Sequence, residues 1–365
     1  MAGDIFDTNT PSNRAQELYY QFLMQVAKSN CRHIVIIAGN HDSPSFLDAP
    51  KTLLRALDVH VIGSICEQSD DEVLVLHDQD GKPEAIICAV PYLRDRDIRV
   101  VEVGESIDDK EQKLIKGIQQ HYLEVCELAE QKRKTLDFDV PIIAMGHLFT
   151  AGGQTIDGDG VRELYVGSLA HVTTDIFPEC IDYLALGHLH VPQKINDCEL
   201  KRYSGSPLPM GFGEARQQKS VCLVSFEQRN ASVSLINIPT FQALYQLKGD
   251  WDSIKTQLKN IMKTDNQAWL EVIYDGGEVL TDLRERVEAT LADTKIEVLR
   301  TTNNRIKNRV LNRIDDNETL DNLNEHDVFE RCLNAHDIPV EQRPDLWRAY
   351  QETLTQLNED DAHAE

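Results

Sequence analysis

The segment HIVIIAGNHD, residues 33–42, joins a short apolar run to a glycine and then to an amide, an imidazole and a carboxylate. A short apolar run bounded by turn or polar residues is typical of a buried β-strand. Glycine at the end of such a strand permits a sharp turn, so that the next side chain points into the space beyond the sheet. The segment therefore predicts a strand whose carboxyl end carries polar side chains.

The same order of residue types occurs at three further places. They are Ala2-Gly3-Asp4, Met145-Gly146-His147 and Leu186-Gly187-His188-Leu189-His190. Any one of these polar residues alone would more often belong to the core or the surface, but four in the same context indicate a common purpose. Ligands of open α/β sheets bind beyond the carboxyl ends of the strands. We therefore expect one site assembled from four loops that are distant in sequence.

The residue types at these loops are those of a divalent metal site. Carboxylate, amide oxygen and imidazole ligands suit Mn²⁺, Fe²⁺ or Zn²⁺, and the spacing of His188 and His190 places both rings on one side of an extended segment. Two metal ions about 3.5–4 Å apart stabilise the attacking and leaving oxygens of a phosphoester together. The pattern thus favours phosphoester hydrolysis.

Asn40 and His41 are neighbours in sequence but are expected to differ in role. If the amide binds metal, the adjacent imidazole can face the scissile phosphate and protonate the leaving oxygen. A histidine in this role needs a carboxylate that orients its other nitrogen. Asp7 is one candidate for that carboxylate, and Asp42 is the competing one.

Alternating apolar runs and helical patterns over the first two thirds of the chain indicate an α/β fold. Helices are predicted for residues 13–28 and 107–132. The predicted strands are residues 34–38, 85–90, 141–145, 183–186 and 221–226. From Phe241 a strand-helix-strand-helix-strand pattern indicates a second, smaller domain. Its predicted elements are residues 241–247, 251–264, 268–274, 280–293 and 296–300.

Composition restricts the class of protein. A chain of 365 residues suggests about two domains. It has neither an apolar stretch of the roughly 18 residues that a membrane-spanning helix needs nor a signal peptide at its start, so a cytoplasmic location is expected. The eight cysteines are dispersed and are expected to be reduced core residues. P-loop, GxSxG and GxGxxG motifs are absent from the sequence, so ATPase, serine hydrolase and dinucleotide-binding functions have no support.

The charge is polarised along the chain. The formal net charge is −24, and residues 315–365 contribute −12 of it through 15 acidic and three basic residues. Just before them, residues 300–313 carry five positive charges and no negative one. This basic stretch is either a DNA contact or a solvated linker. Helical patterns at residues 328–334 and 346–357 make a partner-binding tail more plausible than simple solubilising disorder.

These motifs and their flanking sequence resemble a known family. GDIFD, GNHD, GH and GHLH, in this order, resemble the metallophosphoesterase (calcineurin-like) superfamily. The longer segments AGNHDSPSFLDAP, PYLRDRDI, YVGSLAHV, DYLALGHLH and RYSGSPLPMGFGE are similar to the SbcD family of bacterial nuclease subunits. The similarity extends over nearly the whole chain.

The resemblance implies a specific architecture. It implies an α/β fold with a layered β-sandwich flanked by helices, a smaller α+β capping domain and a C-terminal helical tail. The implied boundaries are residues 1–238 for the nuclease domain, 239–304 for the capping domain and 305–365 for the basic linker and acidic tail.

The resemblance also assigns roles to the residues of the four loops. Asp4 matches the ligand that bridges two metals, while Asn40, His147 and His188 match ligands of one metal. His190 matches a ligand of the other metal, and His41 matches the catalytic histidine.

The implied activity is that of an Mn²⁺-dependent DNA exonuclease and endonuclease, with Mg²⁺ as the alternative ion. The implied partners are DNA and an SbcC-type ABC ATPase, whose coiled-coil base binds the C-terminal helices. A homodimer of the nuclease chain within a heterotetramer is also implied, as is a role in DNA repair and recombination.

One departure from the family pattern concerns the second metal. The family motif begins with a strand ending in D-x-H upstream of GDIFD, and Met1 stands where that strand is expected. We therefore expect an N-terminally shortened form, by a mispredicted start or a real truncation, with Asp4 and His190 alone at the second metal and weak or absent nuclease activity. The alternatives are a non-catalytic chain that only binds the ATPase, and a stand-alone phosphatase or cyclic-nucleotide phosphodiesterase.

The remaining histidines lie outside any such motif and are predicted to do no chemistry. They are His33, His60, His77, His121, His171, His326, His336 and His363.

Overall fold

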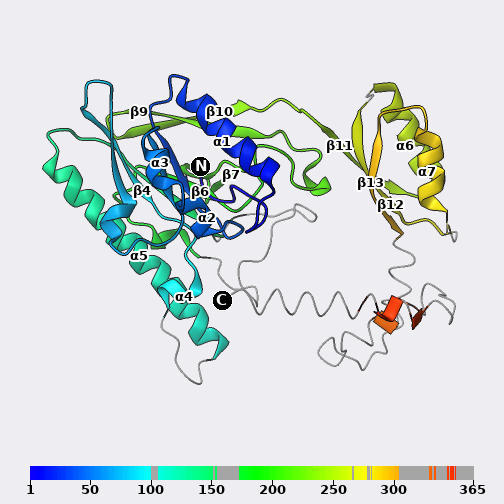
Figure 1. Ribbon diagram of the computed structural model, residues 1–365, viewed down its shortest axis with the longest axis horizontal. Coiled ribbons are helices and arrows are strands. Elements are labelled where there is room, and N and C mark those ends of the chain that lie inside the picture. The colour runs from blue at the N-terminus through cyan, green and yellow to red at the C-terminus, as the bar shows by residue number, and fades with distance from the viewer. Residues whose placement is uncertain are drawn as a thin grey trace. The chain divides into compact units, whose positions relative to one another are not determined.

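A computed structural model describes most of the chain. The described residues are 1–99, 106–150, 153, 172–264, 267–277, 280 and 282–303, and near the C-terminus 329, 330, 333, 343, 344, 346–348 and 350. The chain divides into two compact units, Met1–Phe241 and Gln242–Glu365 (Figure 1).

Two sheets form the centre of the first unit. The larger has six strands in the order β3 (Val73–His77), β4 (Pro83–Ala89), β5 (Ile142–His147), β6 (Tyr183–Gly187), β8 (Cys198–Tyr203) and β7 (Gln193–Ile195). Strands β4, β5, β6 and β8 are mutually parallel, and β3 and β7 pair antiparallel at the edges. The smaller sheet pairs β1 (Ile34–Ile37) with β2 (Val59–Ile62) in parallel.

Alternation along the strands explains how these sheets stack. In β4, Ile86 and Cys88 point to one face, where they pack against the long helix α5 (Ile107–Thr135), while Ile87 and Ala89 point to the other. The second face meets Ile37 of β1. The two sheets therefore pack face to face around an apolar layer.

Helices cover the outer faces of this sandwich. Ile36 and Val61 point away from the interior of the sandwich and pack against α1 (Asn13–Ala27), α2 (Pro44–Asp48) and α3 (Lys51–Arg55). Figure 1 shows these helices on one side of the unit and α5 on another. The predicted α/β fold, with a layered sandwich flanked by helices, is confirmed.

The two longer helices begin at serine caps. The Ser12 hydroxyl accepts a hydrogen bond from the Ala15 amide at 3.2 Å, and Ser106 and Asp109 form a reciprocal capping box. These side chains satisfy amides that have no partner inside the helix. They explain why the predicted helices start at residues 13 and 107.

The rest of the first unit consists of short elements and a hairpin. The hairpin joins β9 (Ser220–Glu227) to β10 (Asn230–Asn237). The short helices are α4 (Asp95–Ile98) and the 3-10 turns Ser69–Glu72, Thr174–Ile176 and Phe212–Glu214. Strands β2, β3, β7, β8 and β10 are not among the predicted elements, because several are short and carry charged or polar residues that hide the apolar pattern.

The second unit has the predicted strand-helix-strand-helix-strand order. Its elements are β11 (Ala243–Gly249), α6 (Trp251–Thr264), β12 (Ala268–Tyr274), α7 (Leu283–Leu291) and β13 (Glu297–Asn303). Leu258 of α6 and Val287 of α7 pack on Leu270 of β12. Both strand pairs are parallel, so this unit is α/β rather than the expected α+β. Helical connections between successive strands impose that parallel arrangement.

Most of the C-terminal tail lies outside the described residues. The same is true of most residues of the basic stretch and of most residues of each predicted tail helix. Phe329, Trp347 and Tyr350 contact one another through their rings. Of the described cysteines, all are free; Cys88 and Cys126 are buried core residues as expected, whereas Cys31 is exposed. Among the described residues, none of the helices is both long and apolar enough to cross a membrane.

Candidate metal centre

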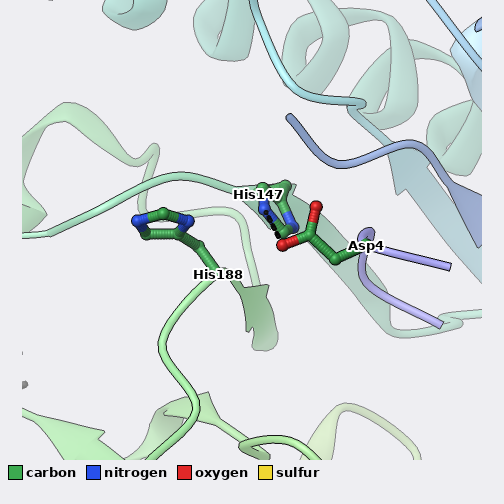
Figure 2. A group of neighbouring side chains, drawn as sticks. All are labelled: Asp4, His147 and His188. Carbon is green, nitrogen blue, oxygen red and sulfur yellow. Dashed lines mark ion pairs between the residues drawn. The ribbon is translucent and has the colours of Figure 1, made fainter. Parts of the chain in front are cut away.

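Asp4, His147 and His188 meet in space although 184 positions separate the first from the last. His147 ends β5, His188 directly follows β6, and Asp4 follows Ala2, which forms a parallel bridge to Ile37 of β1. One ligand atom from each of the three side chains lies within 4.8 Å of the others. Figure 2 shows the Asp4 carboxylate against the His147 ring, with His188 reaching the group from a separate loop.

The hydrogen bonds of His147 determine which nitrogen carries its proton. Its Nδ1 lies 2.8 Å from the Ala2 carbonyl oxygen, which can only accept, so Nδ1–H is the donor. Its Nε2 then faces two oxygens, Asn40 Oδ1 at 3.0 Å and Asp4 Oδ2 at 3.2 Å. A ring that is also protonated at Nε2 donates to these oxygens and carries a positive charge beside Asp4. In the neutral ring all three of these atoms are acceptors, an arrangement that a bound cation stabilises.

Asp4 is ionised throughout the ordinary pH range. Burial alone would raise its pKa, but the hydrogen bond and charge of His147, together with the His41 amide that donates to Oδ1 at 3.1 Å, lower the pKa to about 2. Because of this low pKa, the carboxylate is a permanent negative charge at the centre of the group. The backbone of Asp4 lies in the left-handed region at φ 49°.

His188 is held in an unusual state. The residue is buried, its backbone has φ 101°, and its Nδ1 has no hydrogen-bond partner among the described residues. Burial lowers its pKa to about 3, helped by the charges of His147, His190 and His41 and opposed by that of Asp4. A strained, neutral imidazole with an unpartnered buried nitrogen is the form that binds a metal.

The glycines of the four motifs mainly allow neighbouring chain segments to approach one another closely, and only one of them is needed for a sharp turn. Of Gly3, Gly39, Gly146 and Gly187, Gly3 alone has a positive φ. A Cβ on Gly39 would lie 2.1 Å from Asp4 Oδ1, and one on Gly187 would lie 1.6 Å from the Ala2 carbonyl oxygen. The predicted turning role therefore applies to Gly3, while the others allow neighbouring segments to touch.

Asp42 has a structural role in the loop and does not orient His41. Its buried carboxylate accepts hydrogen bonds from the amides of Ile5 at 3.1 Å, Phe6 at 2.9 Å and Gly39 at 2.8 Å. These bonds tie the Asp4 segment to the end of β1. Burial raises the pKa of Asp42, and the three amides oppose that rise.

His41 is oriented by Asp7, mainly through the backbone. Its Nδ1 lies 3.0 Å from the Asp7 carbonyl oxygen and 3.5 Å from the carboxylate oxygen Oδ1, and the carboxylate is 71% exposed. The nearer carbonyl is the principal acceptor. Neither His41 nor Asp7 belongs to the group of three metal-ligand side chains.

His190 contacts a buried ion pair that the sequence analysis missed. Its Nδ1 lies 3.2 Å from Glu214 Oε1, and Glu214 pairs through Oε2 with the buried Lys219. Lys219 also donates to the His190 carbonyl oxygen at 2.9 Å and to Ser206 Oγ at 3.0 Å. The only sequence signal was two opposite charges five residues apart, which commonly lie on a surface.

Comparisons with known proteins agree with this geometry. The family model of the calcineurin-like phosphoesterases matches residues 1–192, and that of the type 5 capsule protein repressor C-terminal domain matches residues 240–337. The chain is 34% identical over 364 residues to the SbcD chain of the nuclease SbcCD of Escherichia coli strain K12, which covers 98% of this chain and 88% of that protein. It is also 34% identical to the SbcD chains of Rhodobacter capsulatus, over 61% of this chain and 55% of that protein, and of Bacillus subtilis, over 61% and 54%.

Proposed function

Because this chain belongs to the calcineurin-like phosphoesterases and, within them, to the SbcD family of nuclease subunits, we propose that it hydrolyses DNA phosphodiester bonds at the Asp4, His147 and His188 centre. The family makes it a metal-dependent nuclease. The observation that carries the assignment to this centre is the convergence of acceptor atoms from three separate segments. Such a set of oxygens and imidazole nitrogens costs free energy unless a cation occupies it.

The donor set fits a divalent ion. Asp4, Asn40, His147 and His188 would hold one ion, and Asp4 with His190 would contribute to a second. Support comes from the unpartnered Nδ1 of His188 and from the two oxygens that face Nε2 of His147. Oxygen and imidazole ligands suit Mn²⁺, with Mg²⁺ as the alternative. When bound, such ions act as Lewis acids on the phosphate and lower the pKa of water.

The protein residues supply positioning and proton transfer. Since Nδ1–H of His41 is donated to the Asp7 carbonyl, Nε2 is the nitrogen available to a phosphate or leaving oxygen. Asp42 holds the Asp4 segment and the end of β1 together and so keeps Asp4 and His41 in register. Glu214 orients the His190 ring, as outer carboxylates orient metal-binding histidines.

The partner and the cellular role are proposed from the names of the relatives and from the family. The relatives are named as part of a nuclease called SbcCD, and this supports an SbcC-type ABC ATPase as the partner of this chain. We assign partner binding to residues 305–365, and a nuclease domain and a capping domain to residues 1–238 and 239–304. A homodimer within a heterotetramer, a cytoplasmic location and a role in DNA repair complete the proposal.

The test separates metal binding from cleavage. The variant His41→Gln should bind Mn²⁺ as the wild type does and lose about 100-fold or more of the Mn²⁺-dependent cleavage of linear duplex DNA. His77→Gln, which removes an exposed imidazole, is the matched control and should keep both properties. Asp4→Asn should lose Mn²⁺ binding, measured by calorimetry. Hydrolysis of p-nitrophenyl phosphate esters without cleavage of DNA would contradict the proposed substrate.

A further inference from the structure

A second group of metal-ligand side chains lies at the amino ends of β1 and β2. His33 directly precedes β1, Asp58 directly precedes β2, and His60 lies within β2 opposite Val35. One ligand atom from each of His33, Asp58 and His60 lies within 4.8 Å of the others. His33 directly precedes β1 and Asn40 follows it, so this group lies at the opposite end of β1 from the candidate nuclease centre.

The hydrogen bonding of the His33 ring leaves Nδ1 available to bind a metal. Its Nε2 lies 2.7 Å from the His77 carbonyl oxygen and must be the N–H that donates to it. Its Nδ1 therefore carries a lone pair, and that atom is buried with no partner among the described residues. A histidine that donates one N–H to a backbone carbonyl and offers the opposite lone pair is typical of metal-binding histidines.

His60, in the neighbouring strand, also has a ring nitrogen without a partner. Its Nδ1 is buried and makes no hydrogen bond among the described residues. The rings of His33 and His60 lie 6.2 Å apart with an angle of 56° between their planes, so they are tilted and not stacked. Two unpartnered buried nitrogens in one cluster are costly, and a shared ligand would satisfy both.

Asp58 supplies a negative charge at the open side of the group. The residue is exposed, and its carbonyl accepts from the Ile34 amide at 3.0 Å, which places it beside His33. The guanidinium of Arg32, the residue next to His33, is paired with Glu84.

We propose that His33, Asp58 and His60 form a second metal site, which binds a divalent transition ion of the zinc class. Two imidazoles and one carboxylate are ligands that Zn²⁺ takes in proteins, and the exposed side of the group leaves a fourth position for water. The ion would connect the starts of the two parallel strands. Neither histidine stands in a ligand motif, so the sequence alone predicts no chemistry for them.

The test is Zn²⁺ binding by the full chain, with metal content measured after equilibrium dialysis. Wild type and the control His77→Gln should each hold one more Zn²⁺ per chain than His60→Gln. Asp58→Asn should weaken this extra binding about tenfold or more. Asparagine tolerates the positive φ of 55° at this position, so this variant is expected to fold normally.

The readouts keep the proposal independent of the nuclease centre. His60→Gln should retain Mn²⁺-dependent cleavage, because the second group lies at the other end of β1. On addition of Zn²⁺, the imidazole NMR signals of His33 and His60 should shift, and that of His77 should not. Equal Zn²⁺ content and affinity in wild type, Asp58→Asn and His60→Gln would overturn the proposal.

Discussion

Replacing Glu214 by Gln should destabilise the first unit strongly, because it leaves a buried positive charge without its counterion. Glu214 is fully buried, and its partner Lys219 is 4% exposed. Oε1 of Glu214 also lies 3.2 Å from Nδ1 of His190, and Oε2 accepts a hydrogen bond from the Ser206 hydroxyl at 3.3 Å. Glutamine keeps the size of the side chain and one oxygen but removes the charge.

The expected cost follows from burial. Removing one member of a buried ion pair costs about 3–5 kcal/mol, since the remaining charge stays desolvated. Lys219 retains hydrogen bonds to the His190 carbonyl and to Ser206, so we expect the lower end of that range, about 3 kcal/mol. The matched control is Glu84→Gln. Glu84 pairs with Arg32 on the surface of the same unit, where the two side chains are 50% and 37% exposed, and exposed pairs of this kind contribute little to stability.

The assay must report on the first unit alone. All three tryptophans, Trp251, Trp269 and Trp347, lie in residues 242–365, so their fluorescence follows the wrong part of the chain. Urea unfolding should instead be followed by hydrogen exchange of peptides from β8 and β9. Adding Lys219→Met to Glu214→Gln should recover part of the lost stability, because it removes the unpaired charge.

A difference of less than about 1 kcal/mol between Glu214→Gln and Glu84→Gln would refute this expectation. A further loss of stability on adding Lys219→Met to Glu214→Gln would refute it as well. Either result would mean that the ammonium of Lys219 is well solvated without Glu214.

Further predictions concern the candidate metal centre. Gly187→Ala should destabilise the first unit by about 1–3 kcal/mol or more and abolish Mn²⁺ binding, because the added Cβ would overlap the Ala2 carbonyl oxygen and press on His147. Gly277→Ala is the control. A Cβ at Gly277 meets nothing within 4 Å, so this variant should change stability by less than about 0.5 kcal/mol. The Asp4 pKa of about 2 lies below the unfolded value of about 3.9, so its ionised form stabilises the fold above pH 4 and this contribution is lost as pH falls towards 2. In EDTA, urea unfolding of Asp4→Asn should therefore depend less on pH between 4.5 and 2.5 than that of wild type, and equal slopes would contradict the assigned shift. Mn²⁺ should raise the melting temperature of wild type, and EDTA should reverse the rise; Asp4→Asn should not respond.

Local patterns were sufficient to predict most of the framework of the fold. The apolar runs at residues 34–38, 85–90 and 183–186 became β1, β4 and β6, because buried strands need nothing beyond apolar side chains and flanking turns. The helix at residues 251–264 was predicted with its observed bounds, since its apolar positions recur at helical spacing. Strands such as β7 and β8 were not predicted, because their charged residues interrupt the apolar pattern.

The residues of the candidate site were also predictable from sequence only in part. The motifs alone singled out Asp4, Asn40, His147 and His188, because parallel strands deliver the residues after their carboxyl ends to one edge of a sheet. The need of His41 for an orienting carboxylate made Asp7 and Asp42 candidates, but it did not reveal that the Asp7 carbonyl is the nearer partner of His41.

Tertiary structure decided every contact between residues that no motif connects. The buried pair of Glu214 and Lys219 looks like surface charge in the sequence, and only packing removes it from water. The register that sets Val35 opposite His60 brings His33 and Asp58 to the same end of two strands. Sequence spacing specifies which face of an element a side chain occupies, whereas the distance between two elements depends on how the whole chain packs.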